Sequence, residues 1–336
     1  MTGSVRAVIE IGAVTTRLLV RTATGVSRHA VDLRLGGLRL GATGTLSSVA
    51  VADTSLAALH DILSQFAIAI SDAGGDPGST RVVGTAAMRG ASNPDAVAAV
   101  VDRVLGAELE ILADDVEARL GYLGALAALG STPAADREVV LVDLGGAATP
   151  VVIGGPDGPR GSYVIPVGGA LLSETYLESD PPRPAELSAA LSVVELHIDD
   201  VVRTLAAVAP LVEAARQDEP EAFVVVTGTA EIIAAIEIGL GDVDPRTGEG
   251  PGPVHGFELT REAAEDVFRT LATEAFDDRR HNPGLPAGRV DDVVGACAVL
   301  VEFMRQWDLE HVIVSQAGLL DGVLSEAVTG SEFGER

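Results

Sequence analysis

One unit occurs twice in the sequence and constrains the fold more than any other feature. It consists of an apolar strand, an acidic residue near the strand end, a glycine-containing turn and a second apolar strand. The first copy, VIEIGAVTTRLLV, spans 8–20, and the second, EVVLVDLGGAATPVVIGG, spans 138–155. Aligning Glu10 with Asp143 sets Gly12 over Gly145. This weak internal repeat predicts two similar halves that face one another across a cleft.

Strands and helices alternate along both halves, which predicts an α/β fold. In the first half we expect strands at 5–11, 18–22, 81–84 and 109–112 and helices at 56–70, 94–105 and 114–129. In the second half we expect further strands at 222–226 and 311–314 and helices near 184–207, 229–239, 260–275 and 289–306. Stretches rich in glycine and proline are expected to be surface loops, at 155–159, 180–184 and 241–256.

The segment GSTPAAD at 130–136 is small, polar and proline-containing, so we interpret it as a linker between the halves. The expected domains are therefore residues 1–129 and 130–317, with a C-terminal helix at 318–330 completing the first domain. A chain of 336 residues, of which 47% are hydrophobic, is long enough to bury two cores.

The charge of the chain bears on its partners. There are 49 acidic and 23 basic residues, the net charge is −26, and every basic residue is arginine. A field of this sign repels nucleic acids, so an anionic substrate needs local arginines or a bound cation, although acidity also serves solubility alone. The single cysteine excludes an intramolecular disulfide, and no apolar run reaches the roughly 18 residues of a membrane span. We expect a cytoplasmic protein without nucleic-acid or membrane partners.

The glycine turns fit phosphate binding. Glycines let backbone N–H groups converge on a phosphate, while an acid at the strand end can hold a metal ion or a water molecule. The turn in DLGGAAT contains Asp143, Gly145 and Gly146, and a shorter turn at Gly228 and Thr229 is similar in kind. Two glycines after a strand also form ordinary tight turns, so both interpretations stay open at this point.

Polar residues near two helix starts are candidates for catalysis and anion binding. Three acids lie within 114–117, where the helix dipole favours carboxylates in any case. Among them, Glu117 has apolar neighbours that would raise its pKa, which suits a general base toward water. Thr85, Arg89 and Asn93 form a donor set for phosphate oxygens, the alternative for the arginine being simple solvation.

Taken in chain order, these segments resemble the exopolyphosphatase / guanosine pentaphosphate phosphohydrolase (Ppx/GppA) family. The resemblance extends from Val8 to about Leu324 and implies an actin-like, ribonuclease H-like duplicated fold whose two domains face each other across a cleft. The motifs that carry it occur in the family's order: EIGAVT followed by RLLV, TAAMRGASN, VEARL, DLGGAAT, DPP, VHG, GRVDD and SQAGLLDG.

The resemblance implies a phosphatase that hydrolyses the terminal phosphoanhydride of polyphosphate or of guanosine pentaphosphate. Glu117 falls on the family's catalytic glutamate, and Asp143 and Glu10 would anchor a divalent metal ion, Mg²⁺ or Mn²⁺. The implied phosphate contacts are Gly12, Thr15, Arg89, Asn93, Gly145, Gly146, Thr149, Gly228 and Thr229.

Several loop residues depart from the family pattern. Glu10 replaces an aspartate, Leu171 replaces an arginine, and four small or apolar residues stand where the family has serine, asparagine, glycine and serine: Ala13, Val14, Ala147 and Ala148. A hydrogen bond to a charged group contributes on the order of 1.5–3 kcal/mol, so these losses weaken the grip on phosphate.

Other functions therefore stay open. One is a catalytically impaired family member that binds polyphosphate or a nucleotide as a regulatory protein. Another is a sugar kinase or ATPase of the same fold, with VVVTGTAEII as its adenosine-site segment. The segment 189–215 is apolar on more than one face, which fits either burial against a sheet or a homodimer contact.

Overall fold

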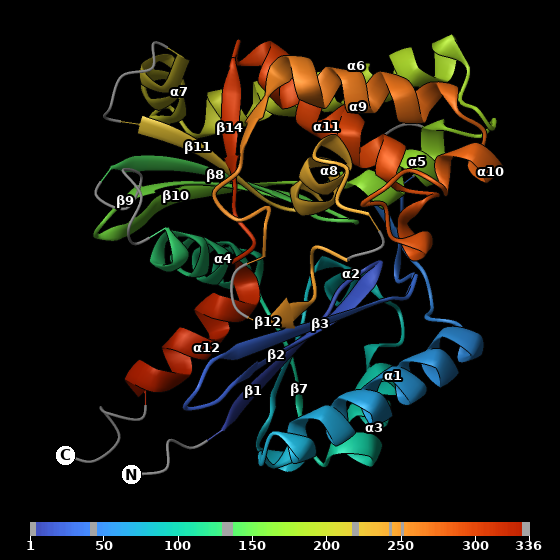
Figure 1. Cartoon of the computed structure of the whole chain (residues 1–336), viewed down its shortest axis with the longest axis vertical. Helices are drawn as coiled ribbons and strands as arrows, with labels where there is room; N and C mark the ends of the chain where they lie inside the picture. Colours follow the sequence, from blue (N-terminus) through green and yellow to red (C-terminus); the bar gives the residue numbers. More distant parts are fainter. Residues whose placement is uncertain are drawn as a thin grey trace.

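The computed structural model describes residues 5–40, 46–129, 137–216, 222–241, 244–249 and 252–330. Within these ranges it contains two six-stranded sheets, which lie one above the other in Figure 1. We call the sheet that contains the first strand, with the helices packed on it, the N-terminal lobe. The other sheet and its helices form the C-terminal lobe. The predicted linker at 130–136 lies outside the described residues.

The N-terminal lobe is built mainly from the first 111 residues. Its strands are β1 (Arg6–Ile11), β2 (Thr15–Arg21), β3 (Val26–Asp32), β6 (Arg81–Gly84), β7 (Leu109–Ile111) and β12 (Gly248–Glu249). Its helices are α1 (Asp53–Asp72), α2 (Ala86–Gly90), α3 (Pro94–Leu105) and α12 (Leu319–Gly330), and a small hairpin pairs β4 (Leu38–Leu40) with β5 (Leu46–Ser48).

The C-terminal lobe carries more helices. Its strands are β8 (Glu138–Leu144), β9 (Thr149–Gly155), β10 (Gly158–Ile165), β11 (Ala222–Gly228), β13 (Glu258–Thr260) and β14 (His311–Val314). The associated helices are α4 (Asp114–Ala128), α5 (Gly169–Tyr176), α6 (Pro184–Thr204), α7 (Val208–Arg216), α8 (Ala230–Glu237), α9 (Arg261–Thr273), α10 (Phe276–Arg279) and α11 (Val293–Gln306).

The two sheets share one topology. In the N-terminal sheet the order β3-β2-β1-β6-β7 joins an antiparallel meander to two parallel strands. In the C-terminal sheet β10-β9-β8-β11-β14 repeats that pattern. The predicted internal repeat is therefore confirmed. Glu10 and Asp143 are each the second-last residue of the equivalent strands β1 and β8, so both acids reach the same edge of their sheets.

Helices cover both faces of each sheet. One face of the N-terminal sheet packs on α1 and α3, because Leu59, Leu63 and Phe66 recur at helical spacing and meet Ile9 and Ile11. By length and composition α1 is also the one described helix that could cross a membrane, and one of its faces packs on the sheet. The opposite face of the N-terminal sheet packs on α12, and the C-terminal sheet lies between α4 and a large helical layer that includes α6, α9 and α11.

Helices α4 and α12 cross at glycines, which lets segments far apart in sequence approach closely. A Cβ on Gly124 would lie 1.9 Å from the carbonyl oxygen of Gly318, and one on Gly322 would lie 1.9 Å from that of Leu120. This contact brings the start of α4, which carries Glu117, against the helix that covers the N-terminal sheet. Figure 1 shows the pair running side by side below the C-terminal sheet.

Several elements differ from the sequence-based expectations. The second strand begins at Thr15, because the hairpin pairs Ile11 with Thr16. Strands β3 and β10 and helix α5 were not expected: β3 is partly exposed throughout, while β10 and α5 begin at glycines that resemble turn signals. The stretch 241–256 is not simply a surface loop, since it contributes β12 to the N-terminal sheet and contains the buried Arg246.

Candidate active site between the lobes

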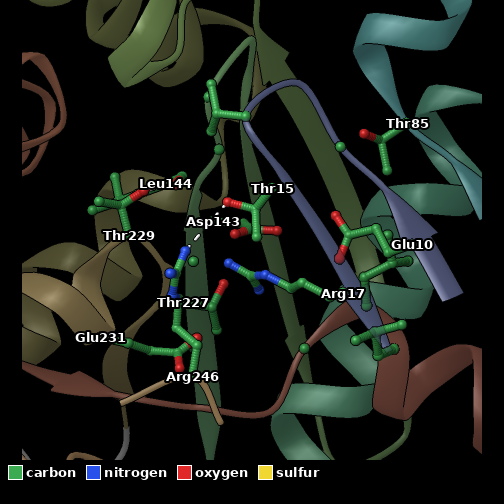
Figure 2. A pocket seen from close by; sticks show the side chains of 18 of the residues that line it. Glu10, Thr15, Arg17, Thr85, Asp143, Leu144, Thr227, Thr229, Glu231 and Arg246 are labelled. Atoms are coloured by element: carbon green, nitrogen blue, oxygen red, sulfur yellow. Dashed lines mark hydrogen bonds between the residues drawn. The ribbon is translucent and has the colours of Figure 1, made fainter. Parts of the chain in front are cut away.

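A cavity lies between the facing edges of the two sheets. It is lined by the turns after β1, β8 and β11, by the first turns of α4, α8 and α12, and by side chains of β2 and β3. Glu10, Asp143, Arg17 and Glu231 all project into it from different elements, as Figure 2 shows. Both lobes therefore contribute charged groups to one enclosed space.

Two acids stand at equivalent ends of β1 and β8. The hairpin register sets Glu10 opposite Arg17, and the parallel register sets Asp143 opposite Thr227. Burial is the main reason that the pKa values of both carboxyls are raised, and the charge of Arg17 opposes that rise. The negative charge of Asp143 raises the pKa of Glu10 further. The pair is thus an acidic site whose charge is partly balanced by that of Arg17.

Glu117 is a third acid in the cavity. It lies in the first turn of α4, and its side chain is 12% exposed. Burial raises its pKa to about 7, against the charge and hydrogen bond of Arg89. Arg89 also donates to the carbonyl oxygen of Leu112 at 2.7 Å and pairs with Asp114. A carboxyl with this pKa exchanges protons near neutral pH, which is the property required of a general base.

The carboxylates of the cavity supply only some of the ligands that a divalent cation needs. Among the described residues no group of three or more histidine, cysteine or acidic side chains could hold a metal ion. Glu10 and Asp143 form a half-buried pair whose charges oppose each other, and a bound cation would relieve that repulsion. Mg²⁺ and Mn²⁺ accept two carboxylates when water and phosphate oxygens supply the remaining ligands. The pair therefore fits a cation that is shared with a phosphate substrate.

Four arginines line the cavity, and none was singled out as a site residue from the sequence. Arg28 forms a two-pronged ion pair with Asp321 of α12, at 2.7 and 3.1 Å. Arg289 donates to Asp292 at 2.6 Å and to the hydroxyl of Thr229 at 3.0 Å. These contacts hold both guanidinium groups in place.

Arg246 fixes the segment 244–249 to the N-terminal lobe at the edge of the cavity. Its guanidinium donates to Asp32 of β3 at 2.6 and 2.9 Å and to Asp244 at 2.7 and 2.9 Å. It also donates to the hydroxyl of Thr15 at 3.3 Å. Arg246 is thus held between two carboxylates.

Arg17 differs from the other three arginines. Within the described part of the chain its guanidinium forms no hydrogen bond or ion pair, although the charges of Glu10, Asp143 and Glu231 all act on it. Figure 2 shows its guanidinium at the centre of the cavity. An arginine that is positioned but not engaged is suited to an anionic ligand.

The glycine turns line the cavity, and some of their polar groups already have protein partners. Gly12, Gly145, Gly146 and Gly228 are all cavity residues. The N–H of Gly12 bonds to the carbonyl oxygen of Thr15, and the N–H of Gly145 bonds to that of Asp143. The hydroxyl of Thr15 donates to Asp32 at 3.0 Å, and that of Thr229 donates to Leu144 at 3.0 Å.

The two turns also touch each other. A Cβ on Gly146 would lie 2.8 Å from the side chain of Val14, which is 9% exposed. Ala13, Ala147 and Ala148 are further apolar residues of the cavity wall. Leu171 lies in the core of the C-terminal lobe and is not among the lining residues.

Three of the predicted phosphate contacts lie outside the lining. Arg89 turns its guanidinium to Glu117 and Asp114. Asn93 accepts from the N–H of Val51 at 2.7 Å and donates to its carbonyl oxygen at 3.1 Å. The hydroxyl of Thr149 is buried and donates to the carbonyl oxygen of Val167 at 2.8 Å. The structure gives each of these side chains a protein partner instead of a place in the cavity.

A family model described as the Ppx/GppA phosphatase family matches residues 19–330 of this chain. The chain belongs to the Ppx/GppA phosphatase family. Exopolyphosphatase 2 of Mycobacterium tuberculosis is 29% identical over 334 residues, which cover 94% of this chain and 96% of that relative. Exopolyphosphatase 1 of Mycobacterium bovis is 24% identical over 327 residues, covering 94% of this chain and 86% of the relative.

Solved structures place the fold within the same Ppx/GppA group. The crystal structure of an exopolyphosphatase-like protein matches with a TM-score of 0.80 at 24% identity, over 97% of this chain and 99% of that one. The Aquifex aeolicus member of the Ppx/GppA family matches with a TM-score of 0.70 at 22% identity, over 98% and 99%. The expected actin-like α/β fold with two lobes is confirmed.

Proposed function

We propose that this protein is a phosphohydrolase that releases the terminal phosphate of polyphosphate or of guanosine pentaphosphate. The observation that carries the proposal is the convergence of Glu117 with Glu10, Asp143 and Arg17 in one cavity between the lobes. The names of the relatives support the substrate class, since they include exopolyphosphatases and, over 42% of this chain, a guanosine-5'-triphosphate,3'-diphosphate pyrophosphatase.

In the proposed reaction Glu117 accepts a proton from water. The water oxygen forms a bond to the terminal phosphorus, the phosphoanhydride bond breaks, and its electron pair leaves on the bridging oxygen of the shortened substrate. Arg17 balances the charge of the phosphate oxygens, and Gly12, Gly145, Gly146 and Gly228 let the backbone approach them. Thr15 and Thr229 support these turns through the hydrogen bonds described above. Arg89 acts as a positioning residue for Glu117.

A divalent cation completes the proposed site. When bound, Mg²⁺ or Mn²⁺ supplies electrostatic neutralisation of the phosphate oxygens. Glu10 and Asp143 are the residues that would hold it, as two ligands at the ends of β1 and β8.

Phosphate release tests the proposal directly. Purified protein is incubated with polyphosphate or guanosine pentaphosphate and with Mg²⁺ or Mn²⁺, next to Glu117→Gln and the exposed-site control Glu237→Gln. We expect release by wild type and by the control, and a loss of about 10²–10⁴-fold in Glu117→Gln. No release above the Glu117→Gln level with either substrate and either metal would contradict the proposal.

A second candidate is a family member that binds the same ligands without turnover. The observation that favours it is the apolar contact of Val14 with Gly146, together with the engaged hydroxyls of Thr15 and Thr229. Calorimetric titration with polyphosphate and with guanosine pentaphosphate distinguishes the two. Tight binding without phosphate release supports a regulatory role, and turnover at ordinary enzyme rates eliminates it.

We further propose a cytoplasmic protein with domains at 1–129 and 130–317, the first completed by 318–330. The proposed domains differ from the lobes at α4, which lies within 1–129 but packs on the sheet of the C-terminal lobe. Packing of α12 on the N-terminal sheet supports the assignment of 318–330, while α4 contacts β9 and β10 of the other sheet. The homodimer stays a prediction. Size-exclusion chromatography with light scattering tests it.

A further inference from the structure

Glu231 is a buried acid that the proposed reaction does not use. It lies in the first turn of α8, lines the cavity and is 2% exposed. Within the described residues its carboxyl group has no hydrogen bond and no ion pair. A polar side chain buried without a partner is costly, so a group in this position commonly meets a ligand.

The surroundings of Glu231 are basic but mostly committed to other acids. Arg17 of β2, Arg28 of β3 and Arg246 are the cationic groups that act on it, and Asp244 is the opposing acid. Arg28 and Arg246 are already paired with Asp321, Asp32 and Asp244. In Figure 2 Arg17 lies between Glu10 on one side and Glu231 with Arg246 on the other.

Burial decides the protonation state of Glu231. It raises the pKa of this carboxyl to about 8, while Arg17, Arg28 and Arg246 act in the opposite direction. Below that pH the group is a neutral acid, with one O–H donor and no negative charge. Above it the group is a carboxylate, which only accepts hydrogen bonds and repels anions.

We propose that Glu231 is a specificity-determining residue that, as a neutral acid, donates a hydrogen bond to the phosphate group next to the one that is hydrolysed. This inference rests on the proposed function. In Figure 2 Glu231 lies across Arg17 from Glu10, so a chain of phosphates bound at Arg17 would meet Glu10 with one phosphate group and Glu231 with its neighbour. A carboxylic acid adds a donor in a cavity that already holds several acids, without adding another charge against the substrate.

The proposal predicts a pH dependence of polyphosphate affinity. If only the acid form binds, the fraction of competent protein falls about tenfold between pH 7.0 and 9.0, and KM rises by the same factor. Glu117 titrates near pH 7 and acts on kcat, so KM and kcat are measured separately. The protonation of the substrate also changes with pH. This change is the same for every variant, so it cancels when each variant is compared with wild type at the same pH.

Three variants test the assignment with polyphosphate at a fixed Mg²⁺ concentration. Glu231→Gln keeps a neutral donor, so its KM is expected to change less than about twofold over this range. Glu231→Ala loses the donor and is expected to raise KM about fivefold at pH 7.0. Glu237→Gln, an exposed position of the same helix, should follow wild type. An unchanged pH dependence of KM in Glu231→Gln would overturn the proposal.

Binding separates this inference from the proposed activity. Calorimetry at pH 7.0 and 9.0 measures polyphosphate affinity in the absence of turnover. The two proteins compared are Glu117→Gln and the double variant that also carries Glu231→Gln. If wild type binds polyphosphate but releases no phosphate from it or from guanosine pentaphosphate, the hydrolase proposal fails and the binding ratios still decide the role of Glu231. If wild type does not bind polyphosphate at pH 7.0, this inference is overturned, and phosphate release from guanosine pentaphosphate alone then decides the hydrolase proposal.

Discussion

Two opposing influences set the pKa of Glu117. Burial raises it, and the charge of Arg89 with its hydrogen bond lowers it, with the balance at about 7. Arg89 is itself fixed by Asp114 and by the carbonyl oxygen of Leu112. The arginine therefore controls both the position of the carboxylate and the pH at which it becomes a base.

Replacing Arg89 by glutamine is expected to shift the acidic limb of the kcat profile upward. Without the guanidinium the pKa of Glu117 rises, so less of the base form exists at pH 7 and activity returns as the pH increases. We expect a shift of about one pH unit or more. The measurement is kcat for phosphate release from pH 5.5 to 9.5.

Arg103→Gln, at an exposed position of α3, is the matched control. A role of Arg89 in substrate binding alone would raise KM and leave the acidic limb of kcat where it is in wild type. That outcome would contradict the positioning role.

At the residue scale, acids were easier to identify from the sequence than arginines. Glu10 and Asp143 lie near the ends of apolar strands and Glu117 lies in the first turn of a helix, so local patterns predicted these three acids, whereas the cavity acid Glu231 was not predicted. The position of Arg17 depends on the register of the β1–β2 hairpin, and the Gly12–Thr15 turn sets that register. The turn could therefore have been used to predict that Arg17 lies opposite Glu10. Arg246 comes from a stretch that reads as an ordinary loop, and no local pattern indicates its burial.

Element by element, strongly patterned segments matched the predictions. The predicted strands at 81–84 and 311–314 and the helix at 94–105 have the observed bounds. Strand β3 is half-buried along its whole length. Its sequence therefore has no alternation of buried apolar and exposed polar residues that would have predicted a strand. The crossing of α4 and α12 depends on long-range contacts, which periodicity alone does not indicate.

Two glycines in the crossing helices, Gly322 and Gly121, serve as test and control positions for the close packing. A Cβ on Gly322 would strike the carbonyl oxygen of Leu120 at 1.9 Å, whereas one on Gly121 in α4 has no neighbour within 4 Å. We expect Gly322→Ala to destabilise the protein by about 1–3 kcal/mol through overpacking. Gly121→Ala should be neutral or stabilising by about 0.5–1 kcal/mol, because alanine favours the helix.

Thermal unfolding of the two alanine variants and wild type measures the difference. An equal midpoint for Gly322→Ala and Gly121→Ala would show that the helices separate without penalty. The close crossing would then contribute nothing to stability.

On the scale of the whole molecule, Arg246 and β12 tie the C-terminal half of the chain to the N-terminal sheet. Strand β12 pairs with β3 two residues after Arg246. Burial alone would raise the pKa of Asp32, but the hydrogen bonds and charge of Arg246 lower it below its ordinary value. The stabilisation is therefore complete above the unfolded pKa of Asp32, near 3.8, and is lost as the pH falls through the lower folded value.

Arg246→Gln is expected to destabilise the protein by about 3–5 kcal/mol at pH 7, because it leaves Asp32 and Asp244 facing each other without a cation. Adding Asp32→Asn should restore part of that loss. Arg269→Gln removes an exposed pair with Asp266 and is the control, with an expected change of less than about 1 kcal/mol. Denaturant unfolding at pH 7 and pH 3 measures all four proteins. Equal effects of Arg246→Gln and Arg269→Gln would contradict the role of Arg246 in tying its segment to the N-terminal sheet.

The sequence predicted the overall architecture better than it predicted the details of the cavity. The repeated unit and the ordered motifs indicated two facing α/β halves before any contact was known. How the cavity is filled could not be predicted, since Arg246 and Glu231 meet there only after both sheets and the β12 segment have assembled.

The placement of α12 has a consequence for how the chain is made. The N-terminal sheet consists almost entirely of early residues, yet one of its faces is covered by residues 319–330. During synthesis Val8, Leu19 and Val83 lack their contacts with α12 until residues 319–330 have left the ribosome. The lobe that is translated first is therefore completed last, and its bare apolar face is the surface that a chaperone would meet on the nascent chain.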